Sequence, residues 1–389
     1  MVNNPLNILL LSPYLPAIDT SACSRKVYDH IQLLHQRGHR IYLISFCSEH
    51  DKKRINAIGP CCAQLHLVYI RDYSRYPYKS SSFKKKIESI CKNQDIDILQ
   101  CEKAYMSRYM PKDINVASIL IEHEVLSVSL SERARLENNF IKRFILFARK
   151  IKKHLEEKRW YRKFNRIIVF SENDKEFIRK LYNIDHAEVI PLGINLKNYP
   201  LQDAKEKPYD LIFVGNFSHH PNTDAISYFC KEILPLIKNK LPKISLTIIG
   251  SNAPASIYKL GKFNKNILVT GYVDNVLEGY SKSKVFIAPI RYGTGMRFKI
   301  LEALASRVPV VTTSIGARGI IFKENIKIAD TEKEFADTVI DLLDNPDRCS
   351  ILAEDGRKVI EKYYNCDTLL DRYEDIYNGL LKINTEKIT

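Results

Sequence analysis

A glycine-bearing loop that leads into a helical pattern, in residues 288–305, carries the clearest chemistry in the sequence. A buried apolar strand is predicted to end at Pro289, Gly293 and Gly295 follow, and a helix is expected to begin near Met296. Glycine lets the backbone come close to a ligand, and the first amides of a helix are unpaired donors that favour an anion. The pattern predicts an anion site, with a tight structural turn as the alternative.

Three charged side chains accompany this loop, namely Arg297, Lys299 and Glu302. Arg297 and Lys299 add positive charge beside the start of the helix, where an anion is already favoured. Glu302 lies one turn further along, and a carboxylate there can accept hydrogen bonds from a ribose diol. Because open α/β sheets bind ligands at the carboxyl ends of their strands, we expect a site for a diphosphate and a ribose.

A second group of polar residues, Glu122, His123 and Glu124, directly follows an apolar strand expected at residues 116–121. His123 is interpreted either as a site residue or as a histidine that caps the strand end by bonding to backbone. Glu122 and Glu124 alternate along the chain, so at most one carboxylate is expected to face a site. Ligands on opposite faces of one strand do not chelate a single ion easily, and no metal site is predicted.

The stretch at residues 131–166 is basic and amphipathic. Its apolar positions are Phe140, Ile141, Phe144, Ile145, Phe147, Ala148 and Ile151, and its basic positions include Lys142, Arg143, Arg149, Lys150, Lys152 and Lys153. A helix of this kind can lie on an anionic bilayer. The alternative is a helix packed on its own sheet with a solvated basic face. We therefore expect residues 139–166 to contact an anionic membrane or to form such a packed helix.

Composition bounds the class of protein. The 389 residues, 45% hydrophobic and 27% charged, fit two globular domains. A formal net charge of +15 indicates an anionic partner, such as nucleic acid, a membrane surface or phosphorylated small molecules. No apolar stretch is long enough to span a membrane, and the first residues do not resemble a signal peptide. We expect a cytoplasmic protein, or one at the cytoplasmic face of the inner membrane.

The nine cysteines are scattered and include no CxxC pair, which favours reduced thiols over a disulfide framework or a zinc site.

The elements that position these residues follow an alternating β/α pattern, which is typical of a doubly wound parallel sheet. Strands are predicted at residues 7–11, 40–46, 64–70, 96–101, 116–121 and 166–170, with a helix at 25–37 after the first. A polar, proline-containing linker is expected at residues 193–208. A second series of strands is predicted at residues 209–214, 245–249, 267–270, 285–289 and 308–312, followed by helices from about residue 332.

The segment GTGMRFKILEALA at residues 293–305, followed by Pro309, resembles the donor-site signature of glycosyltransferase family 4, in the subgroup with the motif GxGxRxKxxEAxA. Four further segments are similar to that family. They are FVGNFSHHPNTDA at residues 213–225, VTGYVD at 269–274, EHEV at 122–125 and VFSEND at 169–174. The resemblance spans nearly the whole chain, and is specific for fold and reaction type rather than for the substrate.

This resemblance implies a GT-B fold, in which two Rossmann-like domains with doubly wound parallel sheets face a central cleft. The domains would be an acceptor-binding domain at residues 1–195, a nucleotide-sugar-binding domain at 196–365, and a C-terminal helix at 366–389 that crosses back to the first. The activity implied is retaining, metal-independent transfer of a sugar from a nucleoside-diphosphate sugar, without a cofactor. A UDP-sugar is favoured and a GDP-sugar is second. The acceptor would be a glycan or glycolipid of surface polysaccharide assembly.

The resemblance also implies roles for individual residues. Catalysis would rest on His123, which would touch the transferred sugar, and on Arg297 and Lys299. Ser24, Arg25 and Glu122 would lie on the acceptor side. The donor would be bound by residues from three loops and one helix: Gly215, Asn216, His219, Gly271, Tyr272, Val273, Gly293, Thr294, Gly295, Met296 and Glu302.

The sequence departs from the family pattern at three places. Thr294 stands where many members have the first of two glutamates eight residues apart, so the loop amides of residues 293–296 are expected to recognise the sugar. Asn216, Ser218, His219 and His220 replace a common Arg and Lys, and the two histidines are interpreted as ligand contacts or as turn residues. We infer that Arg297 and Lys299 take over part of the diphosphate neutralisation. Ser21 and Ala22 replace a glycine pair in the first βα loop, so a less intimate backbone contact is expected there.

Two other classes of function compete with this interpretation. A dinucleotide-dependent oxidoreductase would also suit two Rossmann-like halves, but the turn at residues 12–16 contains no GxGxxG. A basic nucleic-acid-binding protein would suit the charge, but no recognised module or platform of basic and aromatic residues is present. We expect no nucleic-acid partner.

Overall fold

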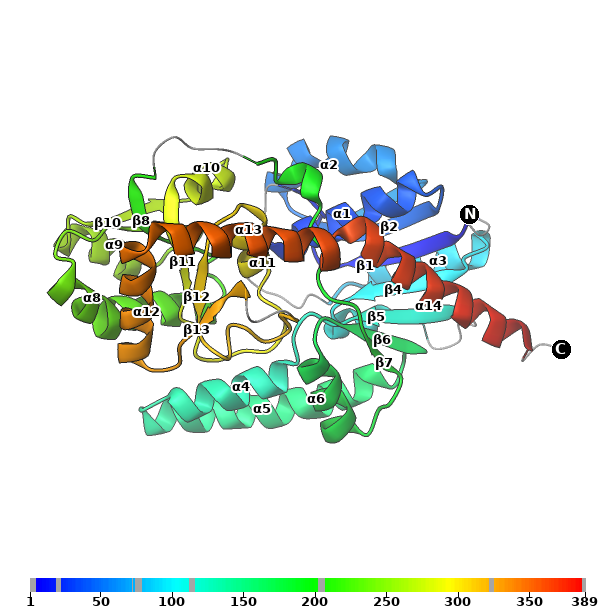
Figure 1. The fold of residues 1–389 in the computed structure, drawn as a ribbon. Helices are drawn as coiled ribbons and strands as arrows, with labels where there is room; N and C mark the ends of the chain where they lie inside the picture. The colour runs from blue at the N-terminus through cyan, green and yellow to red at the C-terminus, as the bar shows by residue number, and fades with distance from the viewer. Residues whose placement is uncertain are drawn as a thin grey trace. The chain divides into compact units, whose positions relative to one another are not determined.

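Two all-parallel sheets organise the chain in this computed structural model, which describes residues 5–18, 22–71, 73, 79–111, 116–201, 207–321 and 325–386 (Figure 1). The chain divides into two compact units. Unit 1 is Met1–Pro191 together with Cys366–Thr389, and unit 2 is Leu192–Asn365. The sequence analysis placed the boundaries after residues 195 and 365.

Within its described ranges, unit 1 has a seven-stranded sheet in the order β3-β2-β1-β4-β5-β6-β7. The strands are β1 (Asn7–Ser12), β2 (Arg40–Cys47), β3 (Gln64–Tyr69), β4 (Ile98–Glu102), β5 (Ala117–Ile121), β6 (Arg166–Val169) and β7 (Ala187–Val189). The helices are α1 (Ala22–Gln36), α2 (Lys52–Ile58), α3 (Ser81–Asn93), α4 (Leu126–Leu136), α5 (Phe140–Tyr161), α6 (Glu172–Tyr182) and α14 (Cys366–Glu386). Short 3-10 turns lie at Glu49–Asp51, Gly59–Cys61 and Ala104–Tyr109.

Unit 2 has a six-stranded sheet in the order β10-β9-β8-β11-β12-β13 over the residues described. Its strands are β8 (Tyr209–Val214), β9 (Leu246–Ile249), β10 (Ile267–Gly271), β11 (Ser283–Ala288), β12 (Val310–Thr312) and β13 (Lys327–Ile328). Its helices are α7 (His220–Tyr228), α8 (Leu234–Lys240), α9 (Ala255–Phe263), α10 (Val276–Ser281), α11 (Phe298–Ala305), α12 (Glu332–Asp344) and α13 (Pro346–Tyr363). A π-helical turn (Phe229–Ile233) joins α7 to α8, and a 3-10 turn lies at Leu196–Asn198.

The sequence explains why these strands pair in parallel. The central strands are almost continuously apolar and are buried on both faces, as in β1 and β2, and such strands are typical of sheets covered by helices on both sides. In each sheet the strand order reverses beside the first strand, between β1 and β4 and between β8 and β11. Ligands bind at such reversal points, outside the carboxyl ends of the strands. The predicted fold class, two doubly wound parallel sheets, is confirmed.

Two local details differ from the prediction, and a third, the turn from strand to helix at residues 169–174, agrees with it. The edge strands β7 and β13 were not predicted, because three and two residues are too few to form an apolar run. Helix α11 begins at Phe298 rather than near Met296, because Arg297 has an extended backbone and caps the helix. The segment at residues 169–174 forms a helix cap, in which Ser171 Oγ accepts from the Asp174 amide at 3.1 Å.

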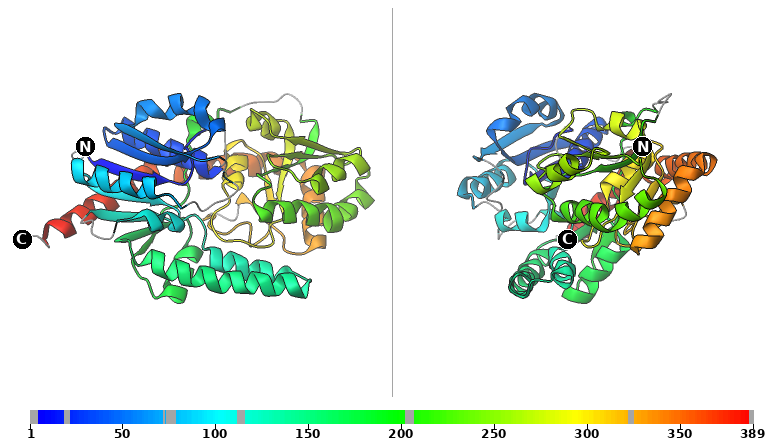
Figure 2. Two further views of the ribbon diagram at one scale, coloured as in Figure 1. Left: turned by 180° about the vertical axis from the view of Figure 1, so that it is seen from behind. Right: turned by 90° about the vertical axis from the view of Figure 1, so that its left-hand side faces the viewer.

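Helices α4 and α5 form an antiparallel hairpin beside the sheet of unit 1, and both views show them lying side by side (Figures 1 and 2). Helix α14 packs on α1, where Glu374 accepts from Arg37 Nη1 at 2.8 Å and bonds His39 Nε2 at 3.0 Å. No helix within the ranges described is both long and apolar enough to cross a membrane. The predicted linker at residues 193–208 includes 202–206, which lie outside the described residues.

Candidate functional site

Three neighbouring strands of unit 2 each end in a glycine, and these glycines bring the strand ends into close backbone contact. Gly215 N donates to the Ile249 carbonyl at 2.9 Å, and Gly250 N donates to the Gly271 carbonyl at 2.8 Å. A Cβ atom on Gly250 would lie 1.7 Å from the Gly215 carbonyl oxygen, so no side chain fits there. Gly271 has a φ of +73°, which favours glycine. Gly215 and Gly271 are predicted site residues; the prediction missed Gly250, although it also follows an apolar strand.

The Lys299 side chain lies against the first of these glycines. Its Nζ donates to Asn222 Oδ1 at 2.6 Å and lies 4.5 Å from the centroid of the Phe213 ring. A Cβ on Gly215 would come within 2.9 Å of this Nζ, so glycine leaves the space that the ammonium occupies. Burial, and to a smaller extent the positive charge of Arg297, lower the pKa of Lys299 to about 7, against the opposing effect of Glu302. An arriving anion would therefore meet an amine that readily takes up a proton.

Asn222 connects Lys299 to the loop that follows β8, and sequence reasoning did not single it out. Its Nδ2 donates to the Asn216 carbonyl at 2.7 Å, and its backbone amide donates to the His219 carbonyl at 3.0 Å. His219 N in turn donates to the Asn216 carbonyl at 3.2 Å, so the backbone of the predicted loop forms a turn. The Asn216 side chain accepts from the Ser218 amide at 2.9 Å. The position of Asn222, directly after Pro221 in the first turn of α7, was the sequence signal that could have indicated its role.

Arg297 folds back onto its own loop. Its Nη1 donates to the Thr294 carbonyl at 2.8 Å, and its Nη2 donates to the carbonyls of Gly293 at 2.8 Å and Tyr292 at 3.3 Å. Gly293 and Gly295 have φ values of +109° and +78°, and Thr294 and Met296 are buried. In this structure the guanidinium therefore holds the loop in shape, which is a different task from the direct diphosphate contact that the sequence suggested.

Glu302 is buried on α11 and is held by a tyrosine from the start of unit 2. The Tyr199 hydroxyl donates to Glu302 Oε1 at 2.7 Å, and both side chains are buried. The Tyr199 carbonyl accepts from Arg357 Nη1 at 2.9 Å, which ties this tyrosine to α13. Tyr272 is exposed and Val273 is partly exposed in the turn after β10. The carboxylate of Glu302, predicted to bind the ribose, is thus held in place by the Tyr199 hydroxyl, which the prediction did not include.

In unit 1, the predicted His123 pairs with a carboxylate that the prediction missed. His123 Nε2 lies 2.7 Å from Glu102 Oε2, and Lys26 Nζ donates to the same oxygen at 3.5 Å. Gln100 Nε2 donates to the other oxygen of Glu102 at 3.0 Å. Lys26 also lies over the Phe170 ring, 5.1 Å from its centroid. The interpretation of His123 as a histidine bonded to backbone at the strand end is wrong for its ring, since that ring meets Glu102.

Charge complementarity sets the ionisation of this cluster. Burial alone would raise the pKa of Glu102, but Lys26 and the hydrogen bond from His123 lower it to about 2. Burial acts to lower the pKa of His123, while its bonds with Cys23 and Glu102 outweigh that effect and raise the pKa. Glu102 follows the apolar run of β4 directly, so a carboxylate at a strand end was the signal for it. The cluster is a charged, buried group at the carboxyl ends of β4 and β5.

Neither glutamate beside His123 meets its ring. Glu122 Oε1 accepts from the His123 amide at 3.0 Å, and Glu124 Oε1 accepts from Ser129 Oγ at 2.6 Å. Burial, together with the nearby negative charge of Glu157, raises the pKa of Glu122 to about 8. Glu122, predicted on the acceptor side, therefore stabilises the turn that carries His123.

The predicted acceptor contacts Ser24 and Arg25 hold the loop between β1 and α1. Ser24 Oγ donates to the Leu15 carbonyl at 3.0 Å and accepts from the Ala17 amide at 2.9 Å. Arg25 Nε donates to the Ile18 carbonyl at 2.8 Å. Ser21 and the side chain of Ala22, also considered in this loop, lie outside the described part of the structure.

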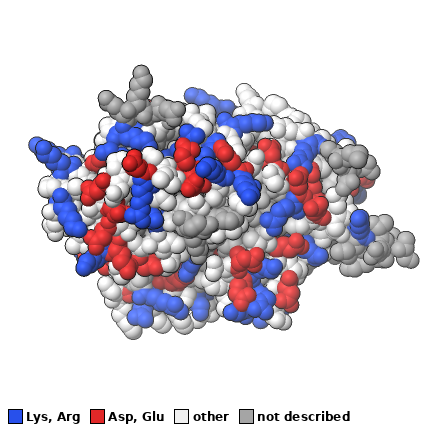
Figure 3. Space-filling view, viewed as in Figure 1, with Lys and Arg blue, Asp and Glu red and all other residues white. Residues whose placement is uncertain are grey.

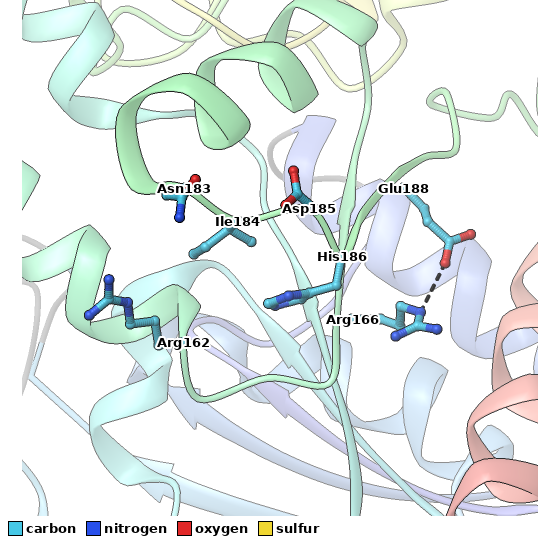
Figure 4. Close-up of a pocket in the computed structure, with 7 residues that line it drawn as sticks. All are labelled: Arg162, Arg166, Asn183, Ile184, Asp185, His186 and Glu188. Carbon is cyan, nitrogen blue, oxygen red and sulfur yellow. Dashed lines mark hydrogen bonds and ion pairs between the residues drawn. The ribbon is translucent and has the colours of Figure 1, made fainter.

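A surface cavity of about 580 Å³ lies away from these residues, beside β6 and β7 (Figure 4). Its lining residues are Arg162, Arg166, Asn183, Ile184, Asp185, His186 and Glu188. Arg166 forms an ion pair with Glu188 at 3.1 Å across its rim. The cavity contains none of the predicted site residues. Among the residues described, no group of three or more His, Cys, Asp and Glu side chains is placed to hold a metal ion.

Comparison with protein families decides the class. Residues 24–198 match the family described as Glycosyltransferase Family 4, and residues 208–345 match the family described as Glycosyl transferases group 1. The chain is a glycosyltransferase with a family 4 domain followed by a group 1 domain. The predicted enzyme class, a glycosyltransferase, is therefore confirmed, and the alternative of a dinucleotide-dependent oxidoreductase is dropped.

Two bacterial proteins are similar in sequence to this glycosyltransferase. It is 23% identical to an uncharacterised 44.6 kDa protein in the cps region of Klebsiella pneumoniae, over 86% of this chain and 90% of that protein. It is 24% identical to the capsular polysaccharide biosynthesis glycosyltransferase CapM of Staphylococcus aureus, over 49% of this chain and 53% of CapM.

Solved structures confirm that this glycosyltransferase has the GT-B fold. Sucrose-phosphate synthase from Thermosynechococcus elongatus aligns with a TM-score of 0.76 at 16% identity, covering 97% of this chain and 100% of that one. A TarM mutant from S. aureus, solved with fondaparinux, alpha-GlcNAc-glycerol and UDP, aligns with a TM-score of 0.70 at 12% identity, covering 96% and 100%.

Proposed function

We propose that this glycosyltransferase moves a sugar, with retention of configuration and without a metal, from a nucleoside-diphosphate sugar to a glycan or lipid-linked acceptor. A UDP-sugar is the favoured donor and a GDP-sugar is second. The observation that carries the proposal is the arrangement around Lys299, where a partly buried amine, the glycines at three strand ends and a glycine loop converge at the carboxyl edge of the unit 2 sheet. Such an edge is where α/β sheets bind phosphorylated ligands.

The proposed roles follow from the contacts in unit 2. Lys299 neutralises the diphosphate as the bond between the sugar and the phosphate oxygen breaks, and Asn222 orients the Lys299 ammonium. Arg297 holds the glycine loop in shape by donating to the carbonyls of residues 292–294. Glu302, fixed by Tyr199, accepts hydrogen bonds from the ribose diol. Stabilising the charge that develops on the leaving group is the main requirement of such chemistry.

In the proposed reaction, the acceptor hydroxyl attacks the anomeric carbon from the face that the leaving group vacates. The glycosidic bond forms as the bond from the anomeric carbon to the phosphate oxygen breaks, and the departing diphosphate takes the acceptor proton. His123, held by Glu102, would contact the transferred sugar. Positioning supplies much of the acceleration in a reaction of this kind, without a nucleophile from the protein.

The proposed setting is surface polysaccharide assembly at the cytoplasmic face of a membrane, with residues 139–166 in contact with anionic lipid. The relatives named for capsule synthesis support the first part. TarM, solved with UDP, supports a uridine nucleotide as the donor.

Kinetics of matched variants test the proposal. Lys299→Ala should lower kcat by roughly 10²–10³-fold, because one charge-stabilising group is lost. Tyr199→Phe should leave kcat nearly unchanged and weaken donor binding, because Glu302 loses the hydroxyl that holds it. Unchanged kinetics in Lys299→Ala, with donor and acceptor both turned over, would overturn the assignment of the site.

A further inference from the structure

The first four turns of α5 expose a stripe of large apolar side chains along one face. Phe140, Phe144, Phe147, Ile151 and Leu155 recur at the spacing of a single helix face, and their exposed fractions are 82%, 66%, 51%, 46% and 63%. Ile141 and Ile145, also exposed, widen the stripe on one side. The opposite face of α5 is the one that packs, since Leu146, Glu157 and Trp160 are buried.

This arrangement excludes the alternative of an ordinary packed amphipathic helix for α5. In a packed helix the apolar face is buried and the polar face is solvated. Here α5 packs on α4 (Figures 1 and 2), and the buried side chains of α5 lie on the face opposite the stripe. An exposed apolar strip of this extent, about 24 Å long over sixteen residues, marks an interaction surface.

The charges beside the stripe define the partner. Residues 140–155 contain six basic side chains and no acidic one. Over most of the face shown in Figure 3, by contrast, Lys and Arg intermix with Asp and Glu. Lys150 Nζ lies 5.5 Å from the centroid of the Phe147 ring, with its stem along the apolar surface and its charge at the edge. The partner must therefore be apolar in its depth and anionic at its surface.

We infer that α5 lies in the plane of an anionic lipid bilayer, with the stripe from Phe140 to Leu155 inserted among the acyl chains and the basic side chains at the phosphate level. A second copy of this chain fits less well, because pairing two stripes would bring two sets of six positive charges together. This inference specifies how the membrane contact of the proposed function is made. One consequence, that the acceptor is lipid-linked, rests on the proposed function. Helix α4, which leads into α5, begins three residues after His123, so the proposed membrane-binding hairpin follows the His123–Glu102 cluster directly in the chain.

Vesicle co-sedimentation of the full chain, without donor or acceptor, tests the docking. The wild type should bind vesicles of phosphatidylglycerol and phosphatidylethanolamine, and bind phosphatidylcholine vesicles much less. The double variant Phe144→Ser and Phe147→Ser should weaken binding to the anionic vesicles by about tenfold or more. Lys142→Glu with Lys152→Glu should remove the preference for anionic lipid. Phe263→Ser, at an 87% exposed position on α9, is the matched control and should bind as the wild type does.

Three results would overturn the inference. One is wild-type binding that is no stronger to anionic than to neutral vesicles. Another is equal binding by the wild type and the Phe144 and Phe147 variant, with unchanged circular dichroism. The third is a stable dimer in sedimentation velocity that this variant dissociates, which would assign the stripe to a second copy. Donor binding measured by calorimetry is a separate readout, so failure of docking is distinguishable from failure of the proposed activity.

Discussion

Binding of a nucleoside-diphosphate sugar should draw a proton from solution onto Lys299. The pKa of this lysine is lowered to about 7 by burial and by Arg297. About half of the side chains are then neutral at pH 7, about nine tenths at pH 8 and about one tenth at pH 6. A diphosphate in contact with the amine favours its charged form and raises its pKa well above 8. Binding should therefore take up about 0.5 proton at pH 7 and about 0.9 at pH 8.

Calorimetry in two buffers of different ionisation enthalpy measures this uptake directly. The intact sugar nucleotide is the ligand to use, because a terminal phosphate titrates near pH 6 and a diphosphate esterified at both ends does not. The affinity should fall as the pH rises through 7, approaching tenfold per pH unit. Lys299→Met should bind more weakly and with no proton uptake. A wild-type enthalpy that is independent of the buffer from pH 6 to pH 8, or an uptake that persists in Lys299→Met, would refute the reasoning.

Three further predictions concern the groups around the two clusters. Glu102→Gln should lower the free energy of unfolding at pH 7 by about 3 kcal/mol, as measured by urea denaturation. The pKa of the wild-type Glu102 carboxyl falls from 4.5 to about 2 on folding, and the variant also leaves Lys26 without a counter-charge. The stabilisation by Glu102 is present above pH 4.5 and disappears as the pH falls towards 2. A variant that is less stable than the wild type by under about 1 kcal/mol at pH 7 would contradict the prediction. Glu122→Gln should raise the free energy of unfolding at pH 8–9 by up to a few kcal/mol, because ionisation of Glu122 destabilises the folded state, in which its pKa is raised to about 8. Equal stability of the variant and the wild type in that pH range would count against the buried position of Glu122. Gly250→Ala should destabilise the protein by about 1–3 kcal/mol in thermal unfolding and weaken donor binding, since the added Cβ would meet the Gly215 carbonyl. The control Gly379→Ala, with nothing within 4 Å of the added Cβ, should be neutral or stabilising by up to about 1 kcal/mol. Equal destabilisation by both variants would contradict the close contact between Gly250 and Gly215.

The fold could be predicted from the sequence because parallel strands buried on both faces leave long apolar runs. Strands such as β1 and β2 were therefore placed to within a residue or two. The short edge strands β7 and β13 have no such run, and the start of α11 depended on the backbone conformation of Arg297, which residue type does not determine.

The site could be predicted only where the residues that act are close in sequence. The segment from Gly293 to Glu302 is one such unit, and its loop and helix were recognised as a whole. Glu102 and Tyr199 were missed because they meet His123 and Glu302 across 21 and 103 residues of chain, a pairing that only the folded structure brings about. Asn222 was missed for the same reason, since its amide group gains its role from Lys299.

The direction of a side chain was the other limit. Arg297 was read as a diphosphate contact from its charge, yet its guanidinium donates to three carbonyls of its own loop. Ser24 and Arg25, predicted on the acceptor side, bond the backbone of the β1–α1 loop in this structure, and their contact with an acceptor stays a prediction. Charge and spacing predict where polar groups gather, whereas the bonds that each group makes depend on the surrounding backbone.

The central claim is that unit 2 binds a nucleoside-diphosphate sugar through the loop and helix from Gly293 to Glu302, and a thermal-shift panel tests it most directly. UDP-, GDP- and ADP-sugars are added to the wild type and to Lys299→Ala. The account predicts that one nucleotide series, UDP first, raises the Tm of the wild type by about 5 °C or more at saturating ligand, and that the variant loses most of this shift. A panel in which no nucleotide sugar raises the Tm, or in which Lys299→Ala responds as the wild type does, would contradict it.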